Sequence, residues 1–303
     1  MLFLCGLGVI KIYGLKNITE NTNTGYICPK CSGELSRRGG SLVCGEGHCY
    51  DISRHGYVNL LMSTKSGASV RGDNREMVAA RQEFLDRGYY IPLRDAVCEA
   101  MLNNLPAYEI LSPITVLDAG CGDCWYSYGI YKALSSTGRE SVMLCVDISK
   151  EALIAGMRRS SKLRTVVASV YNLPVKDKSV NVLFNIFSPL CSDEYFRVIK
   201  PEGLMIRAVP LPRHLWELKL AIYDTPYENE LPRDDCIPGF EKLSERDIEF
   251  MISVDNRHDI MNLFTMTPYR YNTSSEGLNR INSVEALNIT CGFRILTFRK
   301  RNN

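Results

Sequence analysis

Four of the twelve cysteines in this 303-residue chain fall in a short window near its start. Cys28 and Cys31 form a C-x2-C pair, Cys44 follows after twelve residues, and His48 after three more. A tight C-x2-C turn lets two thiolates face one centre, and a second short loop supplies two further ligands. The spacing C-x2-C-x12-C-x3-H therefore predicts tetrahedral zinc. Because the ligand set contains no carboxylate, we expect a closed, structural site.

Other interpretations of these cysteines stay open. Cys49 is a rival to His48 for the fourth ligand position, and the group could instead be free thiols in a small polar region. A redox-active C-x2-C pair normally follows a strand and opens a helix, whereas glycines surround this pair and favour tight loops of a zinc ribbon. Cys121 and the remaining cysteines are expected to be small buried packing residues. Twelve cysteines in a chain of this length are too dilute for a disulfide scaffold and indicate a reducing compartment, the cytoplasm.

A second group of chemically interesting residues follows an apolar run in the middle of the chain. Residues 114–117 lead directly into Asp118-Ala-Gly120-Cys-Gly122-Asp123. A glycine-rich turn between a strand and a helix brings the backbone close to a ligand. Similar loops serve nicotinamide and flavin cofactors, so the glycines alone do not identify the ligand.

Two acids favour S-adenosylmethionine as that ligand. Asp118 ends the first predicted strand, where a phosphate cradle seldom has a carboxylate but a ligand with an ammonium group suits one. Asp147 ends the second predicted strand and can accept hydrogen bonds from ribose hydroxyls. S-adenosylmethionine has an ammonium group, a ribose and no phosphate. The plainer alternative for Asp147 is a solvated turn acid.

The elements that would position these residues alternate between strands and helices. A helical pattern over residues 76–85 places Met77, Ala80, Phe84 and Leu85 on one side, and Gly88 is expected to end it. Further helices are expected from about Tyr126 and over 151–159. Short apolar strands are expected over residues 114–117, 141–146, 165–168, 180–184 and 203–206. This alternation predicts an α/β fold with a mostly parallel sheet and helices on both faces.

Several separate stretches together resemble the RlmA-type large-subunit rRNA (guanine-N1)-methyltransferases, from Cys28 to near the C-terminus. They comprise the Cys/His set, Tyr50-Asp51, residues 56–61, Gly72-Asp73, Met77 with Ala80-Arg81, residues 84–93, residues 117–122, residues 146–149 and residues 210–219. The resemblance implies a class I, Rossmann-like methyltransferase fold with an N-terminal zinc-ribbon-like module that helps to hold rRNA. It implies zinc ligands at Cys28, Cys31, Cys44 and His48. It also implies cofactor contacts at Tyr90, Gly122, Asp123 and His214. From the glycine loop and the strand ends, we further expect cofactor contacts at Asp118, Gly120 and Asp147.

The domain organisation follows from this resemblance. We expect an N-terminal extension over 1–27, a zinc-binding module over 28–60, a linker and helix over 61–88, and a methyltransferase domain over 89–303. The extension is longer than the family usually shows. No run of about 20 apolar residues occurs, so no membrane span is expected. The expected partner is large-subunit rRNA, and a homodimer is one possible assembly.

The implied reaction is methyl transfer from S-adenosylmethionine to N1 of a guanine in a hairpin loop of large-subunit rRNA. The guanine must leave its stack, and Asp123 or a water could accept its N1 proton. Asn185 to Pro189 stand where the family has an Ala-Pro pair, in a stretch expected to face the base. Basic residues of the zinc module, with Lys65 and Arg71 beyond it, and Arg294, Arg299, Lys300 and Arg301 near the C-terminus are candidate phosphate contacts. The alternatives are a small-molecule methyltransferase and a non-catalytic rRNA-binding protein.

Overall fold

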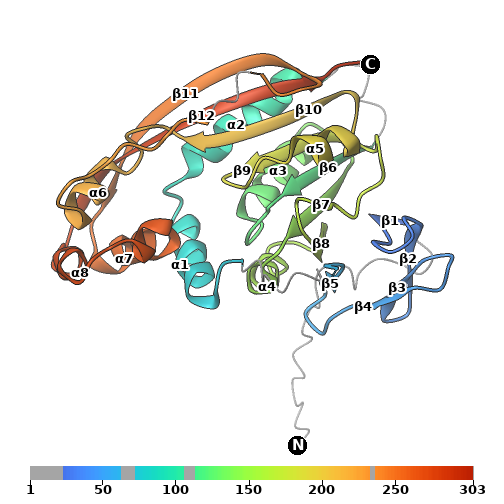
Figure 1. The fold of residues 1–303 in the computed structure, drawn as a ribbon, viewed down its shortest axis with the longest axis horizontal. Helices are drawn as coiled ribbons and strands as arrows, with labels where there is room; N and C mark the ends of the chain where they lie inside the picture. Colours follow the sequence, from blue (N-terminus) through green and yellow to red (C-terminus); the bar gives the residue numbers. More distant parts are fainter. Residues whose placement is uncertain (1–22, 63–71, 106–112, 233–235, 303) are drawn as a thin grey trace, which may run out of the picture.

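The N-terminal module is a small antiparallel sheet. The computed structural model describes residues 23–62, 72–105, 113–232 and 236–302, and Figure 1 shows their arrangement. Strands β1 (Asn23–Ile27), β2 (Glu34–Arg38), β3 (Ser41–Val43) and β4 (Cys49–Asp51) pair in sequence order. Strand β1 thus lies within the range expected as an extension. The rest of that extension, residues 1–22, and most of the expected linker lie outside the described residues.

A second sheet of eight strands forms the body of the molecule. Its order is β11-β12-β10-β9-β6-β7-β8-β5, and only β12 runs antiparallel to its neighbours β10 and β11. The strands are β5 (Val58–Asn59), β6 (Ile114–Ala119), β7 (Ser141–Asp147), β8 (Leu163–Val167), β9 (Val180–Ile186), β10 (Ile199–Pro210), β11 (Phe240–Val254) and β12 (Leu287–Lys300). The predicted α/β fold with a mostly parallel sheet is confirmed. The chain order reverses at β6, between β7 and β9, which is where open α/β sheets bind ligands.

Helices connect most of these strands. They are α1 (Arg75–Asp86), α2 (Ile91–Asn104), α3 (Trp125–Ser136), α4 (Lys150–Gly156), α5 (Ser192–Val198), α6 (Trp216–Ile222), α7 (Arg257–Met266), the 3-10 helix η3 (Pro268–Tyr271) and α8 (Ser275–Asn282). The four residues predicted to share one side of α1 are all buried, and the Asn74 side chain caps its first turn. Helix α4 ends at Gly156, three residues before the predicted end. No helix within the described ranges has the length and apolar composition needed to cross a bilayer.

Three long elements were not predicted. Helix α2 was missed, as were β11 and β12, which form an antiparallel pair along one edge of the sheet. Most residues of β11 are exposed or half-buried, because it is the edge strand, and charged side chains interrupt its apolar pattern. Strand β12 lies between β10 and β11 and is largely buried. Short apolar runs identify central strands, but a charged edge strand lacks that signal.

The zinc ribbon covers part of one face of the large sheet. Tyr26, Leu35 and Leu42 of the ribbon belong to one apolar cluster with Leu144 and Val146 of β7. On the opposite face, α2 and α3 pack over the sheet. Figure 1 shows the ribbon beside β7 and β8, whereas α6, α7 and α8 gather at the other end of the molecule. The ribbon and the sheet therefore share a core, and β5 extends the sheet directly from the ribbon's side.

The Tyr26 hydroxyl enters the hydrogen-bond ladder between β7 and β8. It accepts from the Cys145 amide at 3.0 Å and donates to the Arg164 carbonyl at 2.6 Å. Cys145 is paired with Thr165, and in a parallel ladder an amide bonds the carbonyl of the residue before its partner. The hydroxyl thus bridges the two groups of one rung. Close approach is needed here, since a Cβ on Gly25 would lie 2.8 Å from the Leu144 side chain.

Replacing this hydroxyl should destabilise the whole protein. Tyr26→Phe leaves a buried amide and a buried carbonyl without their bridge, so we expect a loss of about 1–3 kcal/mol in unfolding free energy by urea denaturation. Tyr171→Phe is the matched control, because Tyr171 is exposed and surface changes usually stay within about 0.5 kcal/mol. Equal stability of the two variants would show that the bridge contributes nothing.

Candidate active site and zinc site

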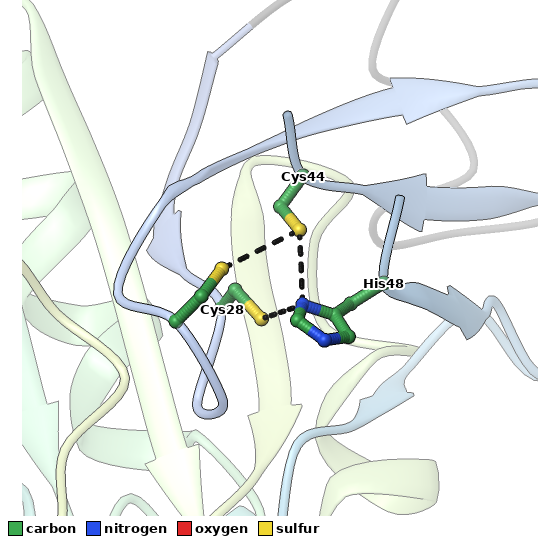
Figure 2. Close-up of side chains that lie close together, drawn as sticks. Cys28, Cys44 and His48 are labelled. Atoms are coloured by element: carbon green, nitrogen blue, oxygen red, sulfur yellow. Dashed lines mark hydrogen bonds between the residues drawn. The ribbon is translucent and has the colours of Figure 1, made fainter. Parts of the chain in front are cut away.

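The structure brings Cys28, Cys31, Cys44 and His48 together. Their ligand atoms all lie within 4.8 Å of one another. The His48 Nδ1 lies 3.5 Å from the Cys28 Sγ and 3.4 Å from the Cys44 Sγ, and the Cys31 and Cys44 sulfurs are 3.6 Å apart. Figure 2 shows the side chains of Cys28, Cys44 and His48 pointing toward one another. Tetrahedral zinc with ordinary Zn–S and Zn–N bonds separates its ligand atoms by about 3.5–3.8 Å, so the four donors fit the metal.

The surroundings of Cys28 favour its thiolate form. Burial raises the pKa of the Cys28 thiol, but hydrogen bonds from the Tyr50 hydroxyl and from backbone amides outweigh burial and lower this pKa to about 6. Metal ligation requires the thiolate. Cys49 starts β4, is exposed, and is not part of the converging group. The geometry thus favours His48 over its rival.

The predicted cofactor loop is the segment Asp118–Asp123 at the carboxyl end of β6. Its two glycines, Gly120 and Gly122, have different roles. Both adopt positive φ, +87° at Gly120 and +52° at Gly122. A Cβ on Gly120 would lie 2.5 Å from the Cβ of Ser188, so this glycine lets the loop after β9 pack on the cofactor loop. A Cβ on Gly122 would meet nothing within 4 Å. Gly122 therefore borders open space, as expected of a residue whose backbone approaches a ligand.

Asp147 holds the cofactor loop in place. Its two carboxylate oxygens accept hydrogen bonds at 2.8 Å from the amides of Gly122 and Ser149. Burial raises the pKa of the Asp147 carboxyl despite these hydrogen bonds. Each carboxylate oxygen can accept a second hydrogen bond. Asp147 can therefore support the loop and still accept from ribose hydroxyls.

Asp118 lies inside the protein. Its side chain is only 2% exposed and accepts a hydrogen bond of 2.6 Å from the Ser127 hydroxyl of α3. Burial raises the pKa of the Asp118 carboxyl to about 7. The observed contact joins β6 to α3 behind the glycine loop. Direct contact between Asp118 and an ammonium group stays a prediction.

Asp123 is engaged by an arginine. Its carboxylate forms an ion pair with Arg159, which also donates to the Asp123 carbonyl at 2.8 Å and to the Asp86 carboxylate at 2.7 Å. Asp123 is almost completely buried. This arrangement has no signal in the sequence, since Arg159 lies 36 residues after Asp123 and beyond helix α4.

Tyr90 and His214 meet around Phe293 of β12. The Phe293 ring centroid lies 5.2 Å from Tyr90 and 4.5 Å from His214. Burial lowers the pKa of His214 to about 3, with a further contribution from the Lys219 charge, so its imidazole is neutral. The His214 Nδ1 accepts from the Gly292 amide at 3.3 Å. Phe293 was missed because β12 was not predicted.

Residues quoted for the family resemblance converge beside Asp147. Asp73 forms an ion pair with Arg81, and the Asp73 carbonyl accepts from the Ser149 hydroxyl at 2.9 Å. A Cβ on Gly72 would lie 2.8 Å from the Ser149 Cβ. The stretches around residues 72–81 and 146–149 therefore form one contact that fixes the turn after β7.

Two known families match the chain. Residues 26–65 match a zinc-ribbon family described as RlmA, N-terminal, and residues 117–206 match a family described as Methyltransferase domain. The chain therefore combines a region that matches the RlmA zinc ribbon with a region that matches a methyltransferase domain. The resemblance seen in the sequence is confirmed, together with the S-adenosylmethionine-dependent fold and a structural zinc site.

Curated relatives match this chain along most of its length. It is 28% identical over 288 residues to the putative 23S rRNA (guanine-N(1)-)-methyltransferase YxjB of Bacillus subtilis, covering 89% of this chain and 95% of the relative. It is 27% identical over 260 residues to the 23S rRNA (guanine(748)-N(1))-methyltransferase of Streptomyces fradiae, covering 84% and 88%. A malonyl-[acyl-carrier protein] O-methyltransferase of Methylovorus is 32% identical over 145 residues, covering 43% and 47%.

Of the basic residues predicted near the C-terminus, Arg294 and Lys300 have partners within the protein. Arg294 forms ion pairs with Glu245 and Asp247, each at 2.7 Å. Lys300 is buried and donates to the carbonyls of Phe196 and Ile199. The prediction for Lys300 was wrong, because its side chain is buried in β12. A phosphate contact of Arg294 stays a prediction. The candidates Lys65 and Arg71 lie outside the described residues.

The metal content of two neighbouring variants tests the zinc site. The parent and Cys49→Ala should each hold about one zinc per chain by elemental analysis, and His48→Ala should hold much less. Because zinc binding contributes to folding, His48→Ala should also lose several kcal/mol of unfolding free energy. Zinc retained by His48→Ala and lost by Cys49→Ala would assign the fourth ligand to Cys49.

Proposed function

We propose that this protein transfers the methyl group of S-adenosylmethionine to N1 of a guanine in a hairpin loop of large-subunit rRNA. The observation that carries the proposal is the joining of an RlmA-type ribbon to a methyltransferase domain through one apolar core. Relatives named for guanine-N1 methylation of 23S rRNA match 89% and 84% of this chain. A reducing compartment, the cytoplasm, stays the expected location.

Positioning of the reactants would account for much of the catalysis. S-adenosylmethionine supplies a methyl group bonded to a sulfonium sulfur, and the neutral thioether that remains after transfer is a good leaving group. Gly122 and Asp147 line the cofactor side of the site. Gly120 lets Ser188 approach, and the Ser188 hydroxyl donates to the Ala119 carbonyl at 2.6 Å. The loop after β9 is thereby held against the cofactor loop, so an acceptor bound there would lie close to the methyl donor.

The N1 proton of guanine needs an acceptor during the reaction. The sequence left Asp123 and a water as alternatives. The ion pair with Arg159 occupies the Asp123 carboxylate, and this carboxylate is almost completely buried. We therefore favour water as the acceptor.

A small-molecule methyltransferase is the competing proposal. The methyltransferase domain alone does not identify the substrate, since a partial match extends to a relative named for O-methylation of malonyl-acyl-carrier protein. That match covers less than half of either chain. The ribbon favours rRNA, because its family is described as RlmA, N-terminal, and the relatives named for rRNA match most of this chain.

Incubation with labelled cofactor and unmodified large-subunit rRNA tests the proposal. We expect about one methyl group per rRNA at N1 of a hairpin-loop guanine, mapped by mass spectrometry of nuclease fragments. Substitution of the mapped guanine by adenine should abolish labelling. The absence of label from rRNA, or label at another atom, would contradict the proposal.

Matched glycine variants connect the labelling to the described loop. Gly122→Ala places a methyl group in the open space beside the loop and should weaken cofactor binding at least about tenfold. Gly138→Ala is the control, since Gly138 also has positive φ and open space around its Cβ position but follows α3. Both variants carry the same type of backbone strain, so only a difference between them reports on the cofactor.

A further inference from the structure

Phe187 is an exposed aromatic residue in an unusual backbone conformation. It is the first residue after β9, its φ is +55°, and it is 47% exposed. Positive φ is uncommon for a bulky side chain and favours glycine. A large apolar ring in such a position is costly for folding and gains little from burial. Its positive φ together with its exposure indicates that the ring has a role outside the core.

The backbone next to Phe187 is fixed against the cofactor loop. Ser188 packs on Gly120 and bonds the Ala119 carbonyl, and the Phe187 amide donates to the Ala208 carbonyl at 3.2 Å. These contacts hold both sides of the residue. The ring is therefore presented at the carboxyl end of β9, beside the loop that borders the methyl donor's site.

A row of largely buried aromatic rings packs against Phe187. Its ring centroid lies 5.5 Å from Phe293 and 6.3 Å from Tyr126. Phe293 in turn contacts Tyr90 and His214. Aromatic contacts at these distances are favourable. The row restricts the Phe187 ring and leaves part of it open to a ligand.

We propose that the exposed face of Phe187 stacks on the guanine that is turned out of the RNA for methylation. This inference rests on the proposed function and specifies where its substrate base lies. A base removed from its stack loses contacts on both faces, and an aromatic side chain replaces one of them without demanding a particular base. Phe187 is thus a substrate-positioning residue beside the methyl donor.

The order of the strands separates this position from the ribose side of the cofactor. Phe187 follows β9 and Asp147 follows β7, and these strands flank β6 on opposite sides. An aromatic ring that stacked on the cofactor's adenine would be expected on the β7 side, near the ribose acid. The Phe187 ring lies on the other side of the glycine loop, which favours the acceptor base over the adenine.

Three variants test this assignment. Phe187→Leu removes the ring, Phe187→Tyr keeps it, and Tyr271→Leu removes an exposed ring elsewhere, in η3. The rate of single-turnover methylation of large-subunit rRNA and the dissociation constant of S-adenosylmethionine are measured for each. With rRNA below saturation, we expect Phe187→Leu to lower the single-turnover rate roughly ten- to a hundredfold with unchanged cofactor affinity, as stacking on an aromatic side chain predicts. Phe187→Tyr and Tyr271→Leu should stay within about threefold of the parent.

Each contrary outcome has a distinct meaning. If the parent methylates rRNA and Phe187→Leu does so at the same rate, the stacking role is wrong although the proposed function holds. If Phe187→Leu weakens cofactor binding instead, the ring contacts the cofactor and the assignment to the base is wrong. If the parent labels no rRNA, the proposed function and the inference that rests on it both fail. Folding of each variant is checked by its thermal unfolding midpoint.

Discussion

The hydroxyl of Tyr26 joins the zinc ribbon to the sheet, and the arrangement of both sites depends on that junction. It bridges an amide of β7 and a carbonyl of β8, two residues before the zinc ligand Cys28. Strand β7 continues from the bridge to Asp147, which holds the glycine loop through the Gly122 amide. The metal site and the cofactor loop are thus connected by a short path whose central residues, Tyr26, Cys145 and Val146, are buried. A ribbon that merely hung from the domain by a linker would not share its core.

The two glycines of the cofactor loop differ in their surroundings: one is closely packed and the other borders open space. Gly120 is needed because Ser188 occupies the space above it, and Gly122 faces the space that a ligand would use. Asp118 and Asp123 are both buried and both satisfied within the protein, by Ser127 and Arg159. Of the three acids near the loop, Asp147 combines a loop-supporting role with a position at the carboxyl end of β7, next to β6, where the strand order reverses. The observed contacts of these three acids therefore stabilise the loop and its surroundings.

Local patterns made much of this predictable. The zinc donors lie within 21 residues of one another, from Cys28 to His48, so their spacing carries the geometry, and the central strands are continuous apolar runs. The aromatic row was not predictable, because Phe293 comes from β12 and meets Tyr90 only after the long antiparallel pair of β11 and β12 has formed. The Arg159–Asp123 ion pair was not predictable for the same reason, because its partners lie 36 residues apart in the sequence. Contacts between segments distant in sequence leave no periodic signal in either segment.

Hydrogen exchange after zinc removal tests most directly whether the ribbon and the sheet are one structural unit. A chelator that strips the metal should loosen β1, and with it the Tyr26 bridge. We expect exchange of the Cys145 amide and of its neighbours in β7 and β8 to rise about tenfold or more, together with exchange of the ribbon amides. A rise confined to residues 23–60, with β7 and β8 protected as before, would contradict this expectation.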